Sequence, residues 1–194
     1  MIAYLEGKFT YKSPASVYID INGVGYEVNI SLNTYSLIQN LSSGRLYTFL
    51  QIKEDAHTLY GFYDILEKEM FVLLIGVSGV GAVTARMMLS SMKPDEISQA
   101  ILRGDSRLLE SVKGIGRKTA ERLVLELRDK VGKQTFEGAG PGKTQNSFEQ
   151  DALNALMALG IAKPVGELAI RKIMAAEPET NQLEILIKKS LKAI

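Results

Sequence analysis

The 194-residue chain contains no cysteine and only one histidine, His57. The absence of cysteine excludes a disulfide scaffold, a thiolate zinc site and a cysteine nucleophile. A single histidine excludes a metal site or a catalytic dyad that needs two, and beside a turn it is most often polar surface. A chain without cysteine fits a reducing compartment, and we expect a cytoplasmic protein.

An excess of charge of one sign is also missing, because 23 lysines and arginines are balanced by 22 aspartates and glutamates. Most proteins dedicated to nucleic acid carry an evident basic excess, so any nucleic-acid site in this chain must be a local patch. Long apolar runs are absent as well. Residues 1–6 do not resemble a signal peptide, and the best apolar run, residues 70–77, is too short to cross a bilayer.

The first region, residues 1–63, shows the alternation of apolar and polar residues that is typical of β-strands. The pattern is clear in residues 17–21, 26–30, 46–52 and 58–63. Turn signals such as Asn22-Gly23 separate these runs, and we expect five short strands. They predict a small closed barrel, since closure removes exposed strand edges.

The second region, residues 64–133, carries the signals of helices and of their ends. Asp64, followed three residues later by Glu67, predicts that a helix begins there. Further helices are predicted from the start and stop signals at Pro94, Gly104 and Asp105 and over residues 118–131.

Residues 134–147 differ from the rest of the chain because glycine, proline and polar residues dominate them. Such a composition offers almost nothing to bury and predicts a flexible linker. Residues 148–194 return to helical patterns, with breaks at Gly160, Pro164 and Pro178, and predict a bundle of three short helices. The expected fold class is α+β and multidomain, with a β-barrel, a central helical domain and a C-terminal three-helix bundle.

An internal repeat is the most informative pattern in the chain. A shift of 35 residues, which carries Gly79 onto Gly114, superimposes one helix–Gly-apolar-Gly–helix segment on a second. The identical pairs are Val77 and Val112, Gly79 and Gly114, Gly81 and Gly116, Thr84 and Thr119, and Ala85 and Ala120. So many matches in so short a stretch indicate a duplicated motif.

The geometry of this motif suits phosphate. Glycines permit a tight turn and the close approach of another backbone, and the apolar residue between them anchors the turn in the core. The helix that follows begins with free N–H groups and the positive end of its dipole, which together favour an anion. We therefore predict contacts with the DNA backbone, without sequence readout, by Gly79, Val80, Gly81, Thr84, Arg86, Gly114, Ile115, Gly116, Arg117, Lys118, Thr119 and Arg122.

The residues alone leave other interpretations of the repeat open. A Gly-x-Gly turn can simply join two helices, and Arg117, Lys118 and Arg122 can form a solvated face. A helix-hairpin-helix DNA glycosylase or nuclease is the enzymatic alternative, although no aspartate follows Lys118 until Asp129. A bridging scaffold for which DNA binding is secondary is a third possibility.

Two other segments carry candidate chemistry. Glu54 and Asp55 lie between two β patterns and therefore at a hairpin tip, where they form either a solvated turn or a metal-binding pair of a nuclease. No further acid or histidine with ligand-like spacing flanks them, which disfavours the metal pair. Gly142-Lys143-Thr144 matches the end of a phosphate-binding loop, but Glu137 stands where that motif requires glycine.

Residues 73–81 and 114–123 resemble the paired helix-hairpin-helix motifs of the RuvA family of Holliday junction branch-migration proteins. Residues 22–28 resemble that family's oligonucleotide-binding-type barrel, residues 53–62 its acidic-pin hairpin, and residues 155–160 its C-terminal three-helix domain. The hairpins by themselves also occur in glycosylases, nucleases and ligases. The order of barrel, pin, paired hairpins, linker and bundle is more specific to the RuvA family.

The resemblance implies a non-catalytic DNA-binding subunit in recombination and DNA repair, with no cofactor of its own. It implies a homotetramer with fourfold symmetry, or an octamer of two tetramers stacked around the DNA, with one junction arm on each subunit. Glu54 and Asp55 would lie at the junction centre, where carboxylates repel phosphates and favour an open crossover. Leu156, Leu159 and Ile161 become candidates for binding the hexameric ATPase RuvB, which consumes the ATP, and the RuvC junction resolvase is a further candidate partner.

The two hairpins differ in charge. The second continues with Arg117 and Lys118, as the family pattern expects, whereas the first continues with Ala82-Val83, where the family often has a lysine. We therefore expect the phosphate contact of the first hairpin to depend more on its backbone N–H groups.

Overall fold

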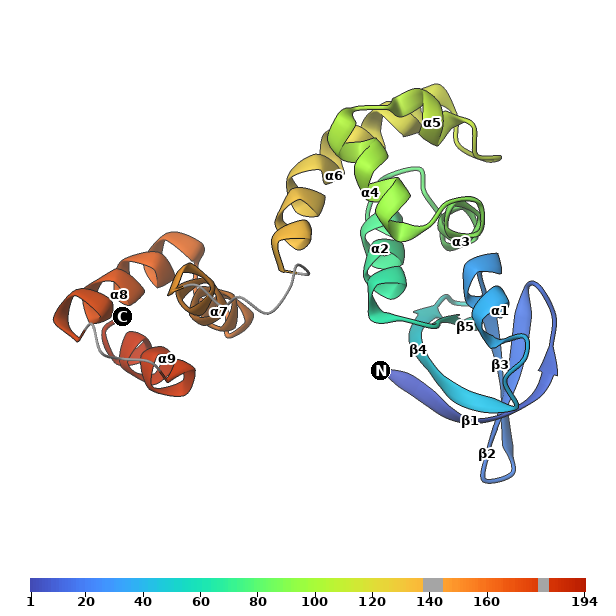
Figure 1. The fold of residues 1–194 in the computed structure, drawn as a ribbon, viewed down its shortest axis with the longest axis horizontal. Coiled ribbons are helices and arrows are strands. Elements are labelled where there is room, and N and C mark those ends of the chain that lie inside the picture. Colours follow the sequence, from blue (N-terminus) through green and yellow to red (C-terminus); the bar gives the residue numbers. More distant parts are fainter. Residues whose placement is uncertain (138–144, 178–181) are drawn as a thin grey trace. The chain divides into compact units, whose positions relative to one another are not determined.

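The computed structural model describes residues 1–137, 145–177 and 182–194, with side chains described for residues 1–132, 148–177 and 182–194 (Figure 1). The chain divides into two compact units, Met1–Gly138 and Ala139–Ile194. The barrel and the central helices form the first unit together, because the apolar core of the helices includes barrel residues.

Five strands form the predicted barrel in the first unit. They are β1 (Tyr4–Lys12), β2 (Ser16–Ile21), β3 (Val24–Ile30), β4 (Ser43–Ile52) and β5 (His57–Phe62). The barrel closes in the order β1-β2-β3-β5-β4, with β3 and β5 parallel and the other pairs antiparallel. In β1, Leu5, Phe9 and Tyr11 alternate with polar residues, a pattern that was not among the runs marked in the sequence. The register of its pairing with β2 shifts between Phe9 and Tyr11.

A short helix between β3 and β4, α1 (Leu32–Ile38), has no counterpart among the predicted elements. It spans only seven residues, and Leu32 and Leu37 are half-exposed, so no continuous apolar stripe marks it in the sequence. The hydroxyl of Ser31 caps the helix by accepting a hydrogen bond from the N–H of Thr34 at 3.0 Å.

Five helices complete the first unit. They are α2 (Ile65–Ile75), α3 (Ala82–Ser91), α4 (Pro94–Arg103), α5 (Ser106–Glu110) and α6 (Arg117–Glu137). The predicted end signals are confirmed: Asp64 caps α2, Asp105 caps α5, and Gly104 ends α4 in the left-handed conformation.

The helix α6 is longer than the predicted range 118–131 and continues into the segment predicted as a linker. Residues 132–137 contain no proline, and each residue added to an existing helix gains a hydrogen bond without a new nucleation cost. The middle of the predicted linker, residues 138–144, lies outside the described residues.

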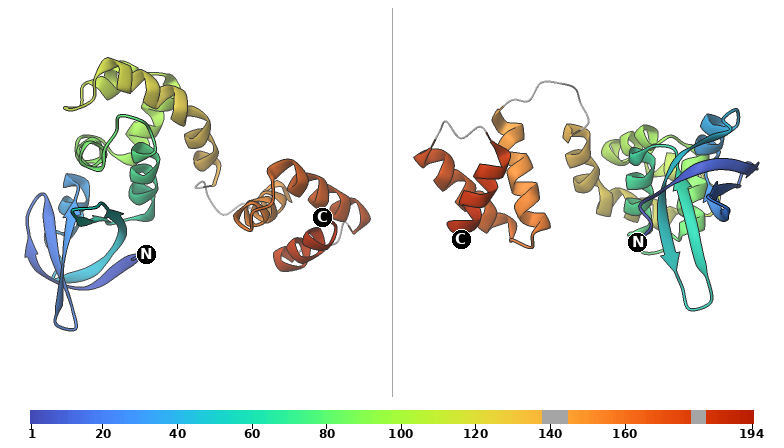
Figure 2. Two further views of the ribbon diagram at one scale, coloured as in Figure 1. Left: turned by 180° about the vertical axis from the view of Figure 1, so that it is seen from behind. Right: turned by 90° about the horizontal axis from the view of Figure 1, so that it is seen from below.

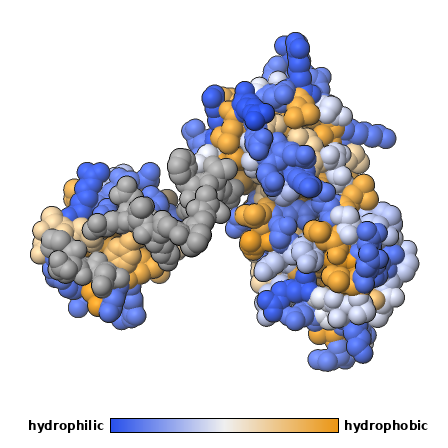
Figure 3. Space-filling view, in the orientation of Figure 1, coloured by the Kyte–Doolittle hydropathy of each residue, from blue (hydrophilic) through white to orange (hydrophobic). Residues whose placement is uncertain are grey.

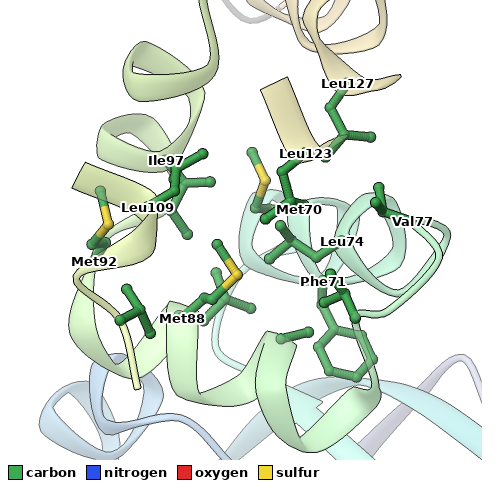
Figure 4. Close-up of a cluster of buried hydrophobic side chains, with 14 of the residues drawn as sticks. Met70, Phe71, Leu74, Val77, Met88, Met92, Ile97, Leu109, Leu123 and Leu127 are labelled. Atoms are coloured by element: carbon green, nitrogen blue, oxygen red, sulfur yellow. The ribbon is translucent and has the colours of Figure 1, made fainter. Parts of the chain in front are cut away.

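The core of the central helices, part of which Figure 4 shows, also includes Tyr60 and Phe62 of β5. Phe71 of α2 is fully buried, and its ring centroid lies 5.5 Å from that of Phe49, 5.1 Å from Tyr60 and 4.9 Å from Phe62. Burying a side chain of this size contributes about 1.5–3 kcal/mol. The apolar contact therefore holds the first helix of the helical domain against the barrel.

The second unit is the predicted three-helix bundle. In the part of the chain that is described, it consists of α7 (Gln145–Ala158), α8 (Lys163–Ala176) and α9 (Leu183–Lys192). The buried residues of its hydrophobic core cluster are Ala152, Leu153, Leu156, Ile170 and Leu186. None of the described helices is long and apolar enough to span a membrane.

Candidate DNA-backbone interface

The two glycine hairpins have the same turn. In the first, the N–H of Val80 donates to the carbonyl of Val77 at 3.0 Å, and in the second the N–H of Ile115 donates to that of Val112 at 3.0 Å. Val80 and Ile115 are each 5% exposed, so the apolar residue of each hairpin is anchored in the core as predicted. The duplication seen in the sequence is thus a duplication of structure.

Each hairpin lies against the helix that follows the other hairpin. A Cβ atom placed on Gly79 would lie 3.7 Å from the Oγ1 of Thr119 in α6, and one on Gly114 would lie 3.8 Å from the Cγ2 of Thr84 in α3. Both glycines have positive φ, +93° and +94°, which disfavours any other residue. The contacts are reciprocal, so the starts of α3 and α6 are held beside one another.

The space in front of both hairpins is open. A Cβ atom placed on Gly81 or Gly116 would meet nothing within 4 Å. Gly81 caps α3 without a side-chain hydrogen bond, and among the described residues no side chain accepts from the N–H groups of the first turn of α3. Another backbone can therefore approach the start of the helix, and a phosphate oxygen is the acceptor that such N–H groups favour.

The cations of α6 are not equally available to an outside anion. The Nε of Arg117 donates to Glu121 at 2.9 Å, and this bond raises the pKa of the guanidinium. Lys118 is exposed and takes part in none of the ion pairs found among the described residues. We therefore regard Lys118 as the side chain best placed to meet a phosphate.

Arg122 brings charge from the second motif to the first hairpin. Its Nη1 donates to the carbonyl of Ser78 at 3.2 Å, and its Nε lies 3.8 Å from the Oε1 of Glu126. The first hairpin is followed by Val83, which is 59% exposed, at the position that Lys118 occupies in the second copy. The guanidinium of Arg122 in α6 therefore lies beside the first hairpin, which has Val83 where the second has Lys118.

Arg86 makes a contact that the sequence did not reveal. Its Nη1 donates to the carbonyl of Ala15 at 3.0 Å and to the Oδ1 of Asn29 at 2.9 Å, both in the barrel. The side chain thus ties α3 to the barrel, whereas sequence reasoning grouped it with the phosphate contacts. No local signal distinguishes the two roles, because Ala15 and Asn29 are far from Arg86 along the chain.

Glu54 and Asp55 occupy the tip of the hairpin between β4 and β5, as predicted. The N–H of Lys53 donates to the carbonyl of Ala56 at 2.9 Å, and both acidic side chains are exposed. Figure 2 shows this hairpin projecting away from the barrel in its right-hand view. Among the described residues, no three histidine, aspartate or glutamate side chains come together where they could hold a metal ion.

The three residues proposed for a partner of the second unit do not share one environment. Leu156 is fully buried in the bundle, which corrects its assignment to a binding surface, because a core side chain cannot meet a partner. Ile161 is partly buried against the same core, whereas Leu159 is 62% exposed. Leu168 of α8 is 72% exposed, and Figure 3 shows hydrophobic surface between hydrophilic groups on this unit.

A closed five-stranded barrel joined to two reciprocal hairpins defines the class of DNA-binding proteins with tandem helix-hairpin-helix motifs. Residues 1–61 match the family model of the RuvA N terminal domain, and residues 71–129 match that of the SAM-like helix-hairpin-helix tandem. The chain belongs to the RuvA family.

Full-length relatives agree with this assignment. The chain is 46% identical to a protein of Cytophaga hutchinsonii over 99% of each chain, and 46% identical to one of Christiangramia forsetii over 100% of each. It is 47% identical to a protein of Flavobacterium psychrophilum over 99% of each chain. All three are named Holliday junction branch migration complex subunit RuvA.

Proposed function

We propose that this chain is the DNA-binding subunit of a Holliday junction branch-migration complex, and that it binds without reading base sequence. The observation that carries the proposal is one compact unit that combines two reciprocal glycine hairpins with a projecting acidic tip. The hairpins offer backbone N–H groups and Lys118 to phosphates, which are the same in every sequence. The glycosylase or nuclease alternative is not favoured, because the full-length relatives carry the branch-migration name.

The acidic tip gives the proposed site its selectivity. In a homotetramer with fourfold symmetry, or in two such tetramers stacked around the DNA, each subunit would hold one arm through both hairpins. Glu54 and Asp55 of the four subunits would then meet near the crossover. Two unit charges 4 Å apart repel by about 1 kcal/mol in water, so several carboxylates favour an open, unstacked centre.

The second unit is proposed to recruit the motor. Leu159 and Leu168 are exposed apolar side chains that a helix or groove of a partner can cover. The partner would be the hexameric ATPase RuvB, which consumes the ATP, so that this chain needs no cofactor and catalyses no reaction itself. The RuvC resolvase is a further proposed partner, and the proposed location of the complex is the cytoplasm.

Competition between DNA shapes tests the proposal. We expect the full chain to bind a four-way junction at least about tenfold more tightly than a linear duplex of equal length, a difference of about 1.4 kcal/mol. Both affinities should fall with salt by about one log unit per log unit of salt for each phosphate neutralised. Equal affinity for junction and duplex in gel-shift titrations would rule out the junction function, and release of bases or cleavage of strands with magnesium would favour the enzyme.

Replacement of Glu54 and Asp55 by alanine should weaken discrimination without weakening binding. We expect duplex affinity to stay equal or rise and the junction-to-duplex ratio to fall about fivefold, because the repulsion at the crossover disappears. The matched control replaces Glu69 and Asp95, two exposed acids on α2 and α4, and should leave the ratio unchanged. A pin variant that behaves like this control would contradict the proposed role of the tip.

A further inference from the structure

Glu67 is a buried acid at the place where the barrel meets the helices. Its side chain is on α2 and is 2% exposed, and Ser31 and Thr34 beside it are fully buried. Its Oε1 accepts a hydrogen bond from the Oγ of Ser31, and its Oε2 accepts one from the Oγ1 of Thr34. The sequence pattern had placed Glu67 in the cap of α2 with Asp64, but only its backbone N–H serves there.

Each hydroxyl beside Glu67 accepts a hydrogen bond from a backbone N–H and donates one to the carboxylate. The Oγ of Ser31 accepts the N–H of Thr34 at 3.0 Å, and the Oγ1 of Thr34 accepts the N–H of Tyr63 at 2.9 Å. Both hydroxyl hydrogens are therefore directed at the carboxylate, which is the arrangement that an ionised acceptor satisfies. Burial raises the pKa of Glu67, and the bonds from the two hydroxyls act against that rise.

Ser31 and Thr34, which donate to Glu67, lie at the start of α1. The same segment also forms hydrogen bonds with α3, the helix that follows the first hairpin. The N–H of Leu32 donates to the Oγ of Ser90 in α3 at 3.1 Å. The Nδ2 of Asn33 donates to the carbonyl of Met92 at 3.1 Å. The helix α1 is thus bonded to α2 through Glu67 and to the end of α3 through these contacts. The position of the second hairpin depends on that of the first, because the reciprocal contacts join the two hairpins.

We propose that Glu67 is a positioning residue that sets the angle between the paired hairpins and the acidic tip. Apolar packing by Phe71 holds the helices on the barrel but tolerates rotation, whereas hydrogen bonds are directional. Arg86 supplies such bonds from α3, and Glu67 supplies them from α2. A buried polar group gives little net stability and can specify one arrangement among several of similar energy. The inference builds on the proposed function: hairpins at a wrong angle still hold a duplex, but they no longer hold four arms around the tip.

The test is Glu67→Gln, which keeps the shape of the side chain. The new amide nitrogen is a hydrogen-bond donor and faces a hydroxyl that is also a donor. We expect the melting temperature to fall by about 5 °C, since a buried donor loses its acceptor. The junction-to-duplex affinity ratio should fall about tenfold, with duplex affinity nearly unchanged. Thr34→Ser, which keeps the hydroxyl, should retain the ratio. Ile97→Val, which loosens the helical core at α4, should lower the melting temperature and also retain the ratio.

A distance measurement tests the angle itself without DNA. Since the chain has no cysteine, spin labels can be placed on cysteines at Ala56, in the tip, and Ser111, beside the second hairpin, both of which are exposed. Labelled chains are diluted into unlabelled protein so that distances within one subunit dominate. Glu67→Gln should broaden the distribution about twofold, as expected when one arrangement gives way to several.

The outcomes separate the two proposals. An unchanged distance distribution and an unchanged ratio in Glu67→Gln would overturn the positioning role, as would a ratio that falls equally in Ile97→Val. A wild-type protein without junction preference would instead overturn the proposed function, and the distance measurement would still decide the role of Glu67. If Glu67→Gln does not fold, Thr34→Val, which removes one of the two hydroxyl donors, is measured in the same way and judged by the same outcomes.

Discussion

Removal of residues 139–194 is expected to abolish motor-driven branch migration and to leave junction binding intact. The first unit keeps its whole core and both hairpins, because the buried residues of the second unit form a separate cluster. The proposed DNA contacts are therefore expected to survive, whereas the exposed apolar residues proposed to bind the motor are lost. Gel shifts with a four-way junction measure the first property, and ATP-dependent strand separation with added RuvB measures the second.

Point variants within the second unit sharpen this prediction. Leu159→Asp changes an exposed side chain and should weaken the response to RuvB while the bundle stays folded. Leu156→Ala is the matched control for a change inside the core, and should destabilise the bundle by about 2–5 kcal/mol. Loss of junction binding on deletion of residues 139–194 would contradict the proposed division of labour between the two units.

Lys118→Ala is expected to weaken junction binding about tenfold or more and to make its salt dependence shallower. In the proposed assembly, each subunit that holds an arm would lose one phosphate contact, and each contact contributes a slope of about one. The loss should be similar for every DNA sequence, because phosphates carry no base information. Titrations of labelled junction at several salt concentrations give both the affinity and the slope.

The structure offers matched controls for this variant. Lys130→Ala removes the same charge from an exposed position further along α6 and should have little effect. Val83→Lys adds a cation at the equivalent position of the first motif and should tighten binding, whereas Val83→Ala should change little. If Lys118→Ala and Lys130→Ala weaken binding equally, the start of α6 is not a phosphate site.

Much of the architecture could be predicted because its signals are local. Alternating residues marked four strands, Asp64 and Asp105 marked helix starts, and Gly104 marked a helix end, since each depends on neighbours in the chain. The short helix α1 and the extension of α6 were missed. Neither has a distinctive apolar pattern, and their formation depends on context rather than on periodicity.

The sequence by itself determined the duplicated hairpins, because a Gly-apolar-Gly turn needs glycine at positive φ and a buried residue between. It also determined the acidic tip, because Glu54 and Asp55 separate two β patterns. Tertiary structure alone decided that each hairpin packs against the other's helix, that Arg86 binds the barrel and that Glu67 turns to α1. These contacts join residues far apart in the chain, and only folding brings such residues within bonding distance.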